Sequence, residues 1–153
     1  MENKLRIEKR DIYTIEVNDN GDCIEFDLAD IELPFKCERA LFTIEKLRKE
    51  FNTKMQIISK KQDFKKKGEY MSNNEKEYFK AQKEMFKGMR IAMDEFLGQG
   101  ACQKIFGDRN YIEMYDDLMK ELDPHLKKME LNFEGMKKRI QNKYGNANNK
   151  VIK

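Results

Sequence analysis

Apolar and polar residues alternate near the start of the chain in the manner of a β-hairpin. Between Cys23 and Leu28 every second side chain is apolar, and residues 12–17 are rich in β-branched and aromatic types. The intervening Asn18-Asp-Asn-Gly-Asp22 supplies residues that tolerate a positive φ. We therefore predict a β-hairpin within the N-terminal segment 1–33. Because two strands alone are marginally stable, they should pack on helices or pair with another chain.

The pattern then changes to the period of amphipathic helices. Pro34 suits a first helical turn, and the following apolar stripe predicts a long helix over residues 35–66. Ser72-Asn-Asn-Glu75 matches a capping box, which predicts a second, antiparallel helix that closes at Gly98. The two stripes consist of Leu41, Ile44, Leu47, Phe51, Met55 and Ile58, and of Phe79, Gln82, Phe86, Met89, Met93 and Phe96.

Three glycines between residues 98 and 107 raise the possibility of a phosphate-binding loop. No strand precedes them and no Gly-Lys-Ser/Thr follows, so neither a Walker A motif nor a dinucleotide fingerprint fits. Gly98 instead suits a helix C-cap, and residues 101–106 suit a short helix that Gly107 stops. We interpret the stretch as a connector between helices.

Two more helices are expected after this connector. The first covers residues 111–122, and Asp123-Pro124 reads as an N-cap and first turn of a last helix that ends at Gly145. The fold is therefore predicted to be mainly α (α+β): an N-terminal β-hairpin followed by a helical bundle of four to five helices with a long first helical hairpin. The helical body spans residues 34–145, and the polar residues 146–153 form a mobile tail.

Composition adds that the core is thin and the charge is segregated. Apolar and charged residues each make up 39% of the 153 residues, which favours one domain of elongated helices or a homo-oligomer. Residues 1–34 carry ten acids and four bases, whereas residues 46–67 carry nine bases and two acids. The basic stretch could face nucleic acid, the chain's own acidic segment or that of a neighbouring copy. No apolar run approaches the roughly 20 residues of a membrane span, so we expect a cytoplasmic protein without a membrane partner.

Residues with catalytic or metal-binding chemistry are sparse. His125 is the only histidine and has no partner at ligand spacing, which favours a structural surface role. The three cysteines Cys23, Cys37 and Cys102 form no CxxC motif, so reduced thiols are expected. No nucleophile and base can be paired from the sequence, and we predict a protein without enzymatic activity, metal or cofactor.

Two sets of residues are candidates for contact with partners. Five lysines cluster between residues 60 and 67. Clustered lysines can hold phosphates, but this cluster lacks arginine, the side chain that usually reads bases. The absence of arginine favours a solvated helix end or an electrostatic docking site. The ten methionines either fill an ordinary core or line a groove that adapts to apolar partner segments. The basic patch comprises Lys60, Lys61, Lys65, Lys66 and Lys67, and the candidate partner contacts are Phe79, Phe86, Met89 and Met93.

A longer motif carries a family resemblance. With Asp94-Glu-Phe-Leu-Gly-Gln-Gly-Ala-Cys-Gln-Lys-Ile-Phe-Gly-Asp-Arg-Asn110, followed by Met114-Tyr-Asp-Asp117 and Pro124-His-Leu126, the chain resembles tail assembly chaperones of long-tailed phages and prophages of Gram-positive bacteria. The resemblance covers about residues 12–144. It implies a non-enzymatic protein that coats the tape measure protein until tail tube subunits replace it. It also implies that many relatives exist in a frameshift-extended form as well. It carries over no catalytic residue.

We accordingly expect a self-associating chaperone that works in the cytoplasm of the bacterial host and binds the tape measure protein or other tail proteins. One alternative is a virion structural component, such as an adaptor of the tail or baseplate. Another is a phage-encoded inhibitor or a nucleic-acid-binding regulator.

Overall fold

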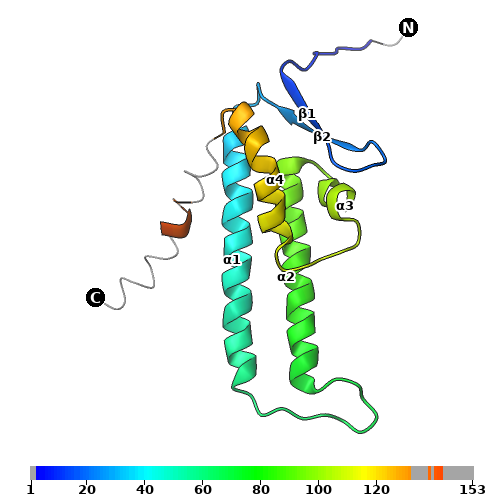
Figure 1. Ribbon diagram of the computed structural model, residues 1–153, viewed down its shortest axis with the longest axis vertical. Helices are drawn as coiled ribbons and strands as arrows, with labels where there is room; N and C mark the ends of the chain where they lie inside the picture. The colour runs from blue at the N-terminus through cyan, green and yellow to red at the C-terminus, as the bar shows by residue number, and fades with distance from the viewer. Residues whose placement is uncertain (1–2, 132–137, 139, 143–153) are drawn as a thin grey trace.

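Helices dominate the protein, and a two-stranded antiparallel hairpin precedes them, which confirms the predicted fold class (Figure 1). The computed structural model describes residues 3–131, 138 and 140–142. The predicted tail 146–153 lies outside these residues, as do residues 132–137, 139 and 143–145 of the predicted last helix; residues 138 and 140–142 of that helix are described and are helical. The elements are β1 (Ile12–Glu16), β2 (Cys23–Asp27), α1 (Leu33–Ser59), α2 (Asn73–Leu97), α3 (Ala101–Phe106) and α4 (Met114–Lys128).

The hairpin forms where the alternation predicts it. The register runs from the pair Ile12 and Asp27 to the pair Glu16 and Cys23, so one face carries the apolar side chains. Ile24 and Phe26 on that face are buried. The face packs on the helices, which supplies the support that two strands lack by themselves.

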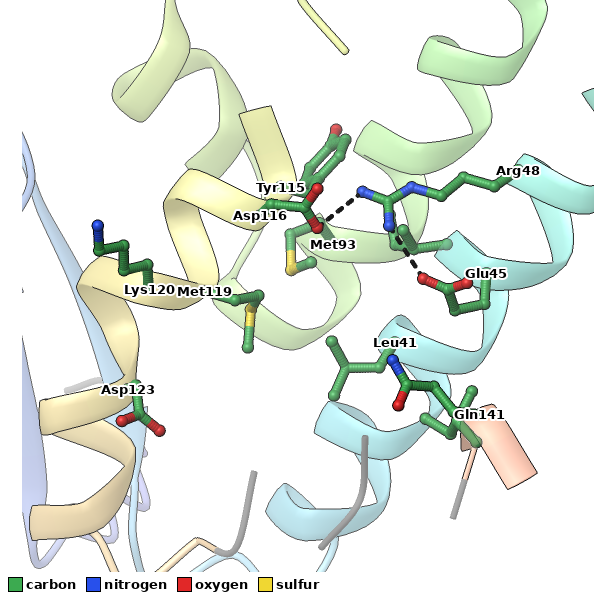
Figure 2. Close-up of a pocket in the computed structure, with 12 residues that line it drawn as sticks. Leu41, Glu45, Arg48, Met93, Tyr115, Asp116, Met119, Lys120, Asp123 and Gln141 are labelled. Atoms are coloured by element: carbon green, nitrogen blue, oxygen red, sulfur yellow. Dashed lines mark hydrogen bonds and ion pairs between the residues drawn. The ribbon is translucent and has the colours of Figure 1, made fainter. Parts of the chain in front are cut away.

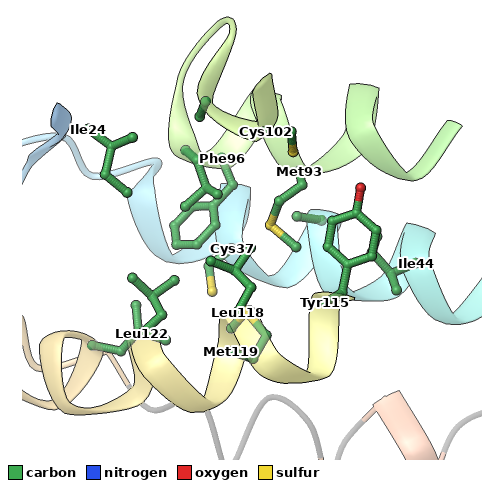
Figure 3. Close-up of a cluster of buried hydrophobic side chains, with 14 of the residues drawn as sticks. Ile24, Cys37, Ile44, Met93, Phe96, Cys102, Tyr115, Leu118, Met119 and Leu122 are labelled. Atoms are coloured by element: carbon green, nitrogen blue, oxygen red, sulfur yellow. The ribbon is translucent and has the colours of Figure 1, made fainter. Parts of the chain in front are cut away.

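One end of the α1/α2 pair holds the hydrophobic core (Figure 3). The β-hairpin, α3 and α4 all pack there. The ring centroids of Phe26 in the hairpin and Phe96 in α2 lie 5.3 Å apart. Figure 1 shows α1 and α2 continuing side by side well past α4. The far part of the helical pair therefore projects from the core.

The first long helix is shorter than predicted, and the lysine cluster therefore lies in a loop. α1 ends at Ser59 instead of near residue 66, and residues 60–72 connect it to α2. The side-chain amide of Asn74 donates to the carbonyl oxygens of Ile58 (3.3 Å) and Lys61 (3.1 Å). Because the last carbonyls of a helix lack intrahelical donors, this side chain from α2 stabilises the helix end.

The predicted helix start at Asp123-Pro124 is wrong. α4 runs through Pro124 to Lys128, and the chain leaves the helix where Glu130 takes a φ of 61°. A proline inside a helix removes a hydrogen bond and costs about 3 kcal/mol. Leu122 and Leu126, both buried, carry the apolar stripe across the proline and offset this cost.

The glycine-rich stretch is a connector, as predicted. Gly98 and Gly107 both cap helices at positive φ values of 113° and 65°. The carboxylate of Asp94 accepts hydrogen bonds from the backbone N–H groups of Gly100 (3.3 Å) and Cys102 (2.9 Å). A side-chain carboxylate thus holds the N–H groups that a phosphate would need.

Candidate partner-binding groove

The part of the helical pair beyond the core has an incomplete apolar layer. We call residues 45–59 of α1 and 73–85 of α2 the distal hairpin. Ala81, at 9% exposure, is the one buried residue in this stretch, all of which the structure describes. The last buried residue of α1 is Ile44. In α2, the buried residues after Ala81 begin at Phe86, so apart from Ala81 both helices are buried only on the core side of the distal hairpin. Apart from α4, which reaches Arg48 through Asp116, no other described helix or strand covers the distal hairpin in Figure 1, so its apolar side chains remain partly accessible.

A groove follows the seam between the two helices of the distal hairpin. It consists of two hollows of about 260 Å³ and 80 Å³, which share Lys54, Ala81 and Glu84. We call their combined surface the seam groove. Its apolar floor comprises Leu47, Phe51, Ile57, Ile58, Ala81 and Met85, and its polar rim comprises Glu50, Lys54, Lys61, Glu77, Lys80 and Glu84.

Small residues on α2 bring the two helices together at this seam. A Cβ atom on Gly88 would lie 3.0 Å from Cδ1 of Leu47, so the absence of a side chain permits the close approach. Ala81 lies seven residues earlier, on the same face, and contributes to both hollows. The sequence reasoning missed this pair, although its seven-residue spacing of small residues on one helix was a visible signal.

The rim balances three lysines against three glutamates. Lys61 Nζ lies 3.2 Å from Glu77 Oε2, and this ion pair links the end of α1 to the first turns of α2. Both side chains are partly exposed, so the pair contributes at most about 1 kcal/mol. An apolar floor between mixed charges suits an amphipathic helix better than a nucleic acid, whose phosphates require an excess of bases.

The structure separates the predicted partner contacts into two groups. Phe86, Met89 and Met93 are at most 6% exposed and belong to the core beneath α4, so they stabilise the fold and are not accessible to a partner. Phe79 is half exposed and lies against Tyr78, with the two rings 5.2 Å apart. Phe79 does not line the seam groove, which takes its exposed apolar surface mainly from Ile57.

The basic patch lies in the loop at the tip of the distal hairpin, where all five lysines are exposed. Asp63 organises this loop: its Oδ1 accepts from the backbone N–H groups of Asn74 and Phe64, each at 2.9 Å. These bonds and one from Ser72 lower the pKa of the Asp63 carboxyl below its ordinary value of 3.8. Lys61 pairs with Glu77, which leaves Lys65–Lys67 as the most uniformly basic stretch of the loop.

Outside the seam groove, another hollow of about 300 Å³ lies between α1 and α4 (Figure 2). Arg48 crosses its rim and pairs with Glu45 (2.9 Å) and with Asp116 (3.1 Å), as Figure 2 shows. Ile140 also lines the hollow and is buried. The Arg48–Asp116 pair joins the two helices, whereas the Arg48–Glu45 pair lies within α1, and this arrangement serves packing.

The two buried cysteines, Cys37 and Cys102, lack the environment of nucleophiles. Burial is the main cause that raises the pKa of both Cys37 and Cys102 to about 12, and nearby Glu38 and Asp94 add to it. Within residues 3–131, 138 and 140–142, no three or more His, Cys, Asp or Glu side chains are grouped to hold a metal ion. No helix of this part of the chain is long and apolar enough to cross a membrane.

Comparison with protein-family models, with curated proteins and with solved structures found no match to this chain.

Proposed function

We propose that this protein is a non-enzymatic chaperone of phage tail assembly, and that its seam groove holds helical segments of the tape measure protein until tail tube subunits replace it. The groove carries the proposal, because it leaves the apolar seam of two packed helices open to a third helix. The family resemblance supplies the identity of the partner.

The dimensions of the groove suit a short helical segment. From Leu47 to Ser59, where α1 ends, its axis advances about 18 Å, which matches about three turns of a partner helix. Burying one large apolar side chain contributes about 1.5–3 kcal/mol, and ordering the partner costs part of this gain. Each copy would therefore bind weakly and reversibly.

Weak individual sites agree with a coating role. Several copies along one long partner gain affinity collectively, because each bound copy raises the effective concentration of the next when the copies also contact one another. The coat can then be displaced copy by copy, as a chaperone that leaves before completion requires.

Co-expression with the tape measure protein encoded by the same phage or prophage tests the proposal. Ile57→Glu places a charge on the groove floor at a side chain that is 55% exposed, and Ile112→Glu makes the same change at a side chain that is 64% exposed and outside the groove. We expect Ile57→Glu to reduce retention of the tape measure protein about tenfold or more, and Ile112→Glu to leave it unchanged. Circular dichroism and thermal unfolding should show that both variants fold like the native chain.

Equal retention by the two variants would overturn the assignment of the groove. Mass spectrometry of finished particles provides an independent check, since a chaperone should be absent and a structural adaptor present. Steeply salt-dependent DNA or RNA binding that is weakened when Lys65, Lys66 and Lys67 are replaced by Ala would favour the nucleic-acid alternative.

A further inference from the structure

An extended arm precedes the hairpin. Residues 3–10 are all exposed and adopt no regular secondary structure, and Figure 1 shows them running away from β1. Leu5 and Ile7 are 87% and 86% exposed. In an extended chain two residues separated by one lie on the same side, so the arm presents an apolar pair on one side and Lys4 and Arg6 on the other.

The outer edge of β1 is open to another strand. Val17 N–H bonds to Asp22 O (2.8 Å) and Leu28 N–H bonds to Asp11 O (3.0 Å), which fixes the odd-numbered residues of β1 as those that face β2. The backbone groups of Ile12, Thr14 and Glu16 therefore point outward. Within the described part of the chain they have no backbone partner.

The outer edge of β2 is less open to another strand than that of β1, because α3 contacts it. Lys104 Nζ donates to the carbonyl oxygen of Cys23 at 3.3 Å, and Asn18 Nδ2 donates to the carbonyl oxygen of Lys104 at 3.0 Å. These bonds tie the turn end of the hairpin to α3. An incoming strand is therefore better accommodated by β1 than by β2.

A hollow beside the packed face of β1 could receive apolar side chains from a third strand. It measures about 420 Å³ and lies between the hairpin, α3 and α4. Successive side chains of an added strand would alternate between this face and solvent. The apolar side chains that line the hollow are Ile15, Val17, Ile24, Ile105, Phe106, Tyr111, Leu118 and Leu122.

The arm and the hairpin carry opposite charges. Residues 3–10 contain four bases and one acid, a net charge of +3, whereas residues 11–33 contain eight acids and no base, a net charge of −8. Glu16 lies on the exposed side of β1, and Glu25 lies beside Thr14 on the neighbouring strand. A strand that turns Lys4 and Arg6 toward this side would bring opposite charges together.

We propose that the arm of one copy adds as a third strand to the β1 edge of a second copy, with Leu5 and Ile7 over the hollow and Lys4 and Arg6 beside the acidic face. This is addition of a strand to an open sheet edge, in which backbone bonds give affinity and alternate side chains give register. The arm of eight residues reaches about 26 Å, well beyond its own hairpin.

The sequence of the arm favours a second copy over its own strand as the partner. Asp11, the turn-favouring residue at the base of the arm, takes a φ of 53°, and the arm runs away from β1 there (Figure 1). To pair with its own β1, the arm would have to reverse direction within Glu8-Lys9-Arg10, which contains none of the Gly, Pro, Asn, Asp or Ser residues that favour tight turns. Exchange in both directions gives a closed dimer, and exchange in one direction gives a ring or filament. The inference is independent of the seam groove, which lies at the other end of α1.

Sedimentation over a range of concentrations tests the exchange. We expect the native chain to associate, and Leu5→Asp with Ile7→Asp to weaken association about tenfold or more. Leu5→Val with Ile7→Val keeps the apolar alternation and should retain association. Raising the salt from about 0.05 M to about 0.5 M should weaken it, because the charges of arm and hairpin are exposed. A native chain that is monomeric throughout, or association that the Asp variant leaves unchanged, would overturn the proposal.

Amide hydrogen exchange distinguishes a second copy from the chain's own arm. In the associated protein the N–H groups of Ile12, Thr14 and Glu16 should be protected, and the Asp variant should lose this protection. Protection of these amides without an increase in mass would mean that the arm folds back on its own strand, which would overturn the second copy as its partner. Ile57→Glu should leave the mass unchanged, so failure of the groove and failure of the arm can be told apart.

Discussion

The hydroxyl of Tyr13 lies 2.7 Å from Nδ1 of His125, and this hydrogen bond joins β1 to α4 across 112 positions of the chain. The two rings also meet edge to face, with centroids 5.6 Å apart. The single histidine therefore has a structural role, half-buried between hairpin and helix. This contact orients β1, the strand whose outer edge we propose as the binding site for the arm of a second copy.

Replacing Tyr13 by Phe should destabilise the protein by about 1 kcal/mol, because the ring remains while the half-buried His125 nitrogen loses its partner. Urea denaturation measures the change in the free energy of unfolding. Tyr70→Phe is the matched control, since Tyr70 is fully exposed. Equal stability of the two variants would show that the hydroxyl does not contribute.

The contact between Leu47 and Gly88 should make substitutions at the two positions non-additive. Gly88→Ala gains about 1 kcal/mol of helix propensity, but its Cβ would lie 3.0 Å from Leu47 Cδ1. In the native background the clash should cancel most of the gain, whereas in a Leu47→Ala background the same change should stabilise by about 1 kcal/mol. Thermal or urea unfolding of the four proteins completes the cycle, and simple additivity would contradict the close approach.

Thiol labelling should distinguish Cys23 from the two buried cysteines. With a pKa of about 12, Cys37 and Cys102 carry only about one thiolate in ten thousand molecules at pH 8. Cys23 is half-buried, and we expect it alone to react quickly with an aromatic disulfide reagent. Cys23→Ser should abolish the fast phase, and fast reaction of a second thiol would contradict the buried environment.

The same two thiols should reduce stability in alkaline solution. Folding raises their pKa from 9.0 to about 12, so above pH 9 the unfolded chain releases protons that the folded chain retains. The free energy of unfolding should therefore fall as pH rises from 9 toward 12. Cys37→Ala with Cys102→Ala should flatten this decline, and an unchanged slope in that variant would assign the effect to other groups.

Asp63 should make the order of the loop at the tip sensitive to acid. Its folded pKa is lowered below 3.8 by N–H donors, so its contribution is present above pH 3.8 and is lost as pH falls through the lower folded value. Hydrogen exchange at Phe64 and Asn74, corrected for intrinsic rates, should therefore show less protection at acidic pH. Asp63→Ala should remove this protection at neutral pH, and equal protection in the variant would contradict the role of the carboxylate.

Elements with local signals could be predicted well. The alternation around Ile24 and Phe26 defines the hairpin, and Ser72 Oγ accepts from Glu75 N–H at 3.2 Å as the capping box requires. Gly98 and Gly107 end helices because they adopt positive φ values at little cost. In each case the residues that decide the structure are neighbours in the sequence.

Contacts between distant segments decided the remainder. Asn74 stabilises the end of α1 from the start of the next helix, and buried leucines carry α4 through Pro124. The apolar stripe of α2 is continuous in sequence, yet only its second half is buried, because α4 packs there and the distal part has no such neighbour. Periodicity determined which residues share a helix face, whereas the position of α4 decided which of them form the core, since burial depends on what lies opposite.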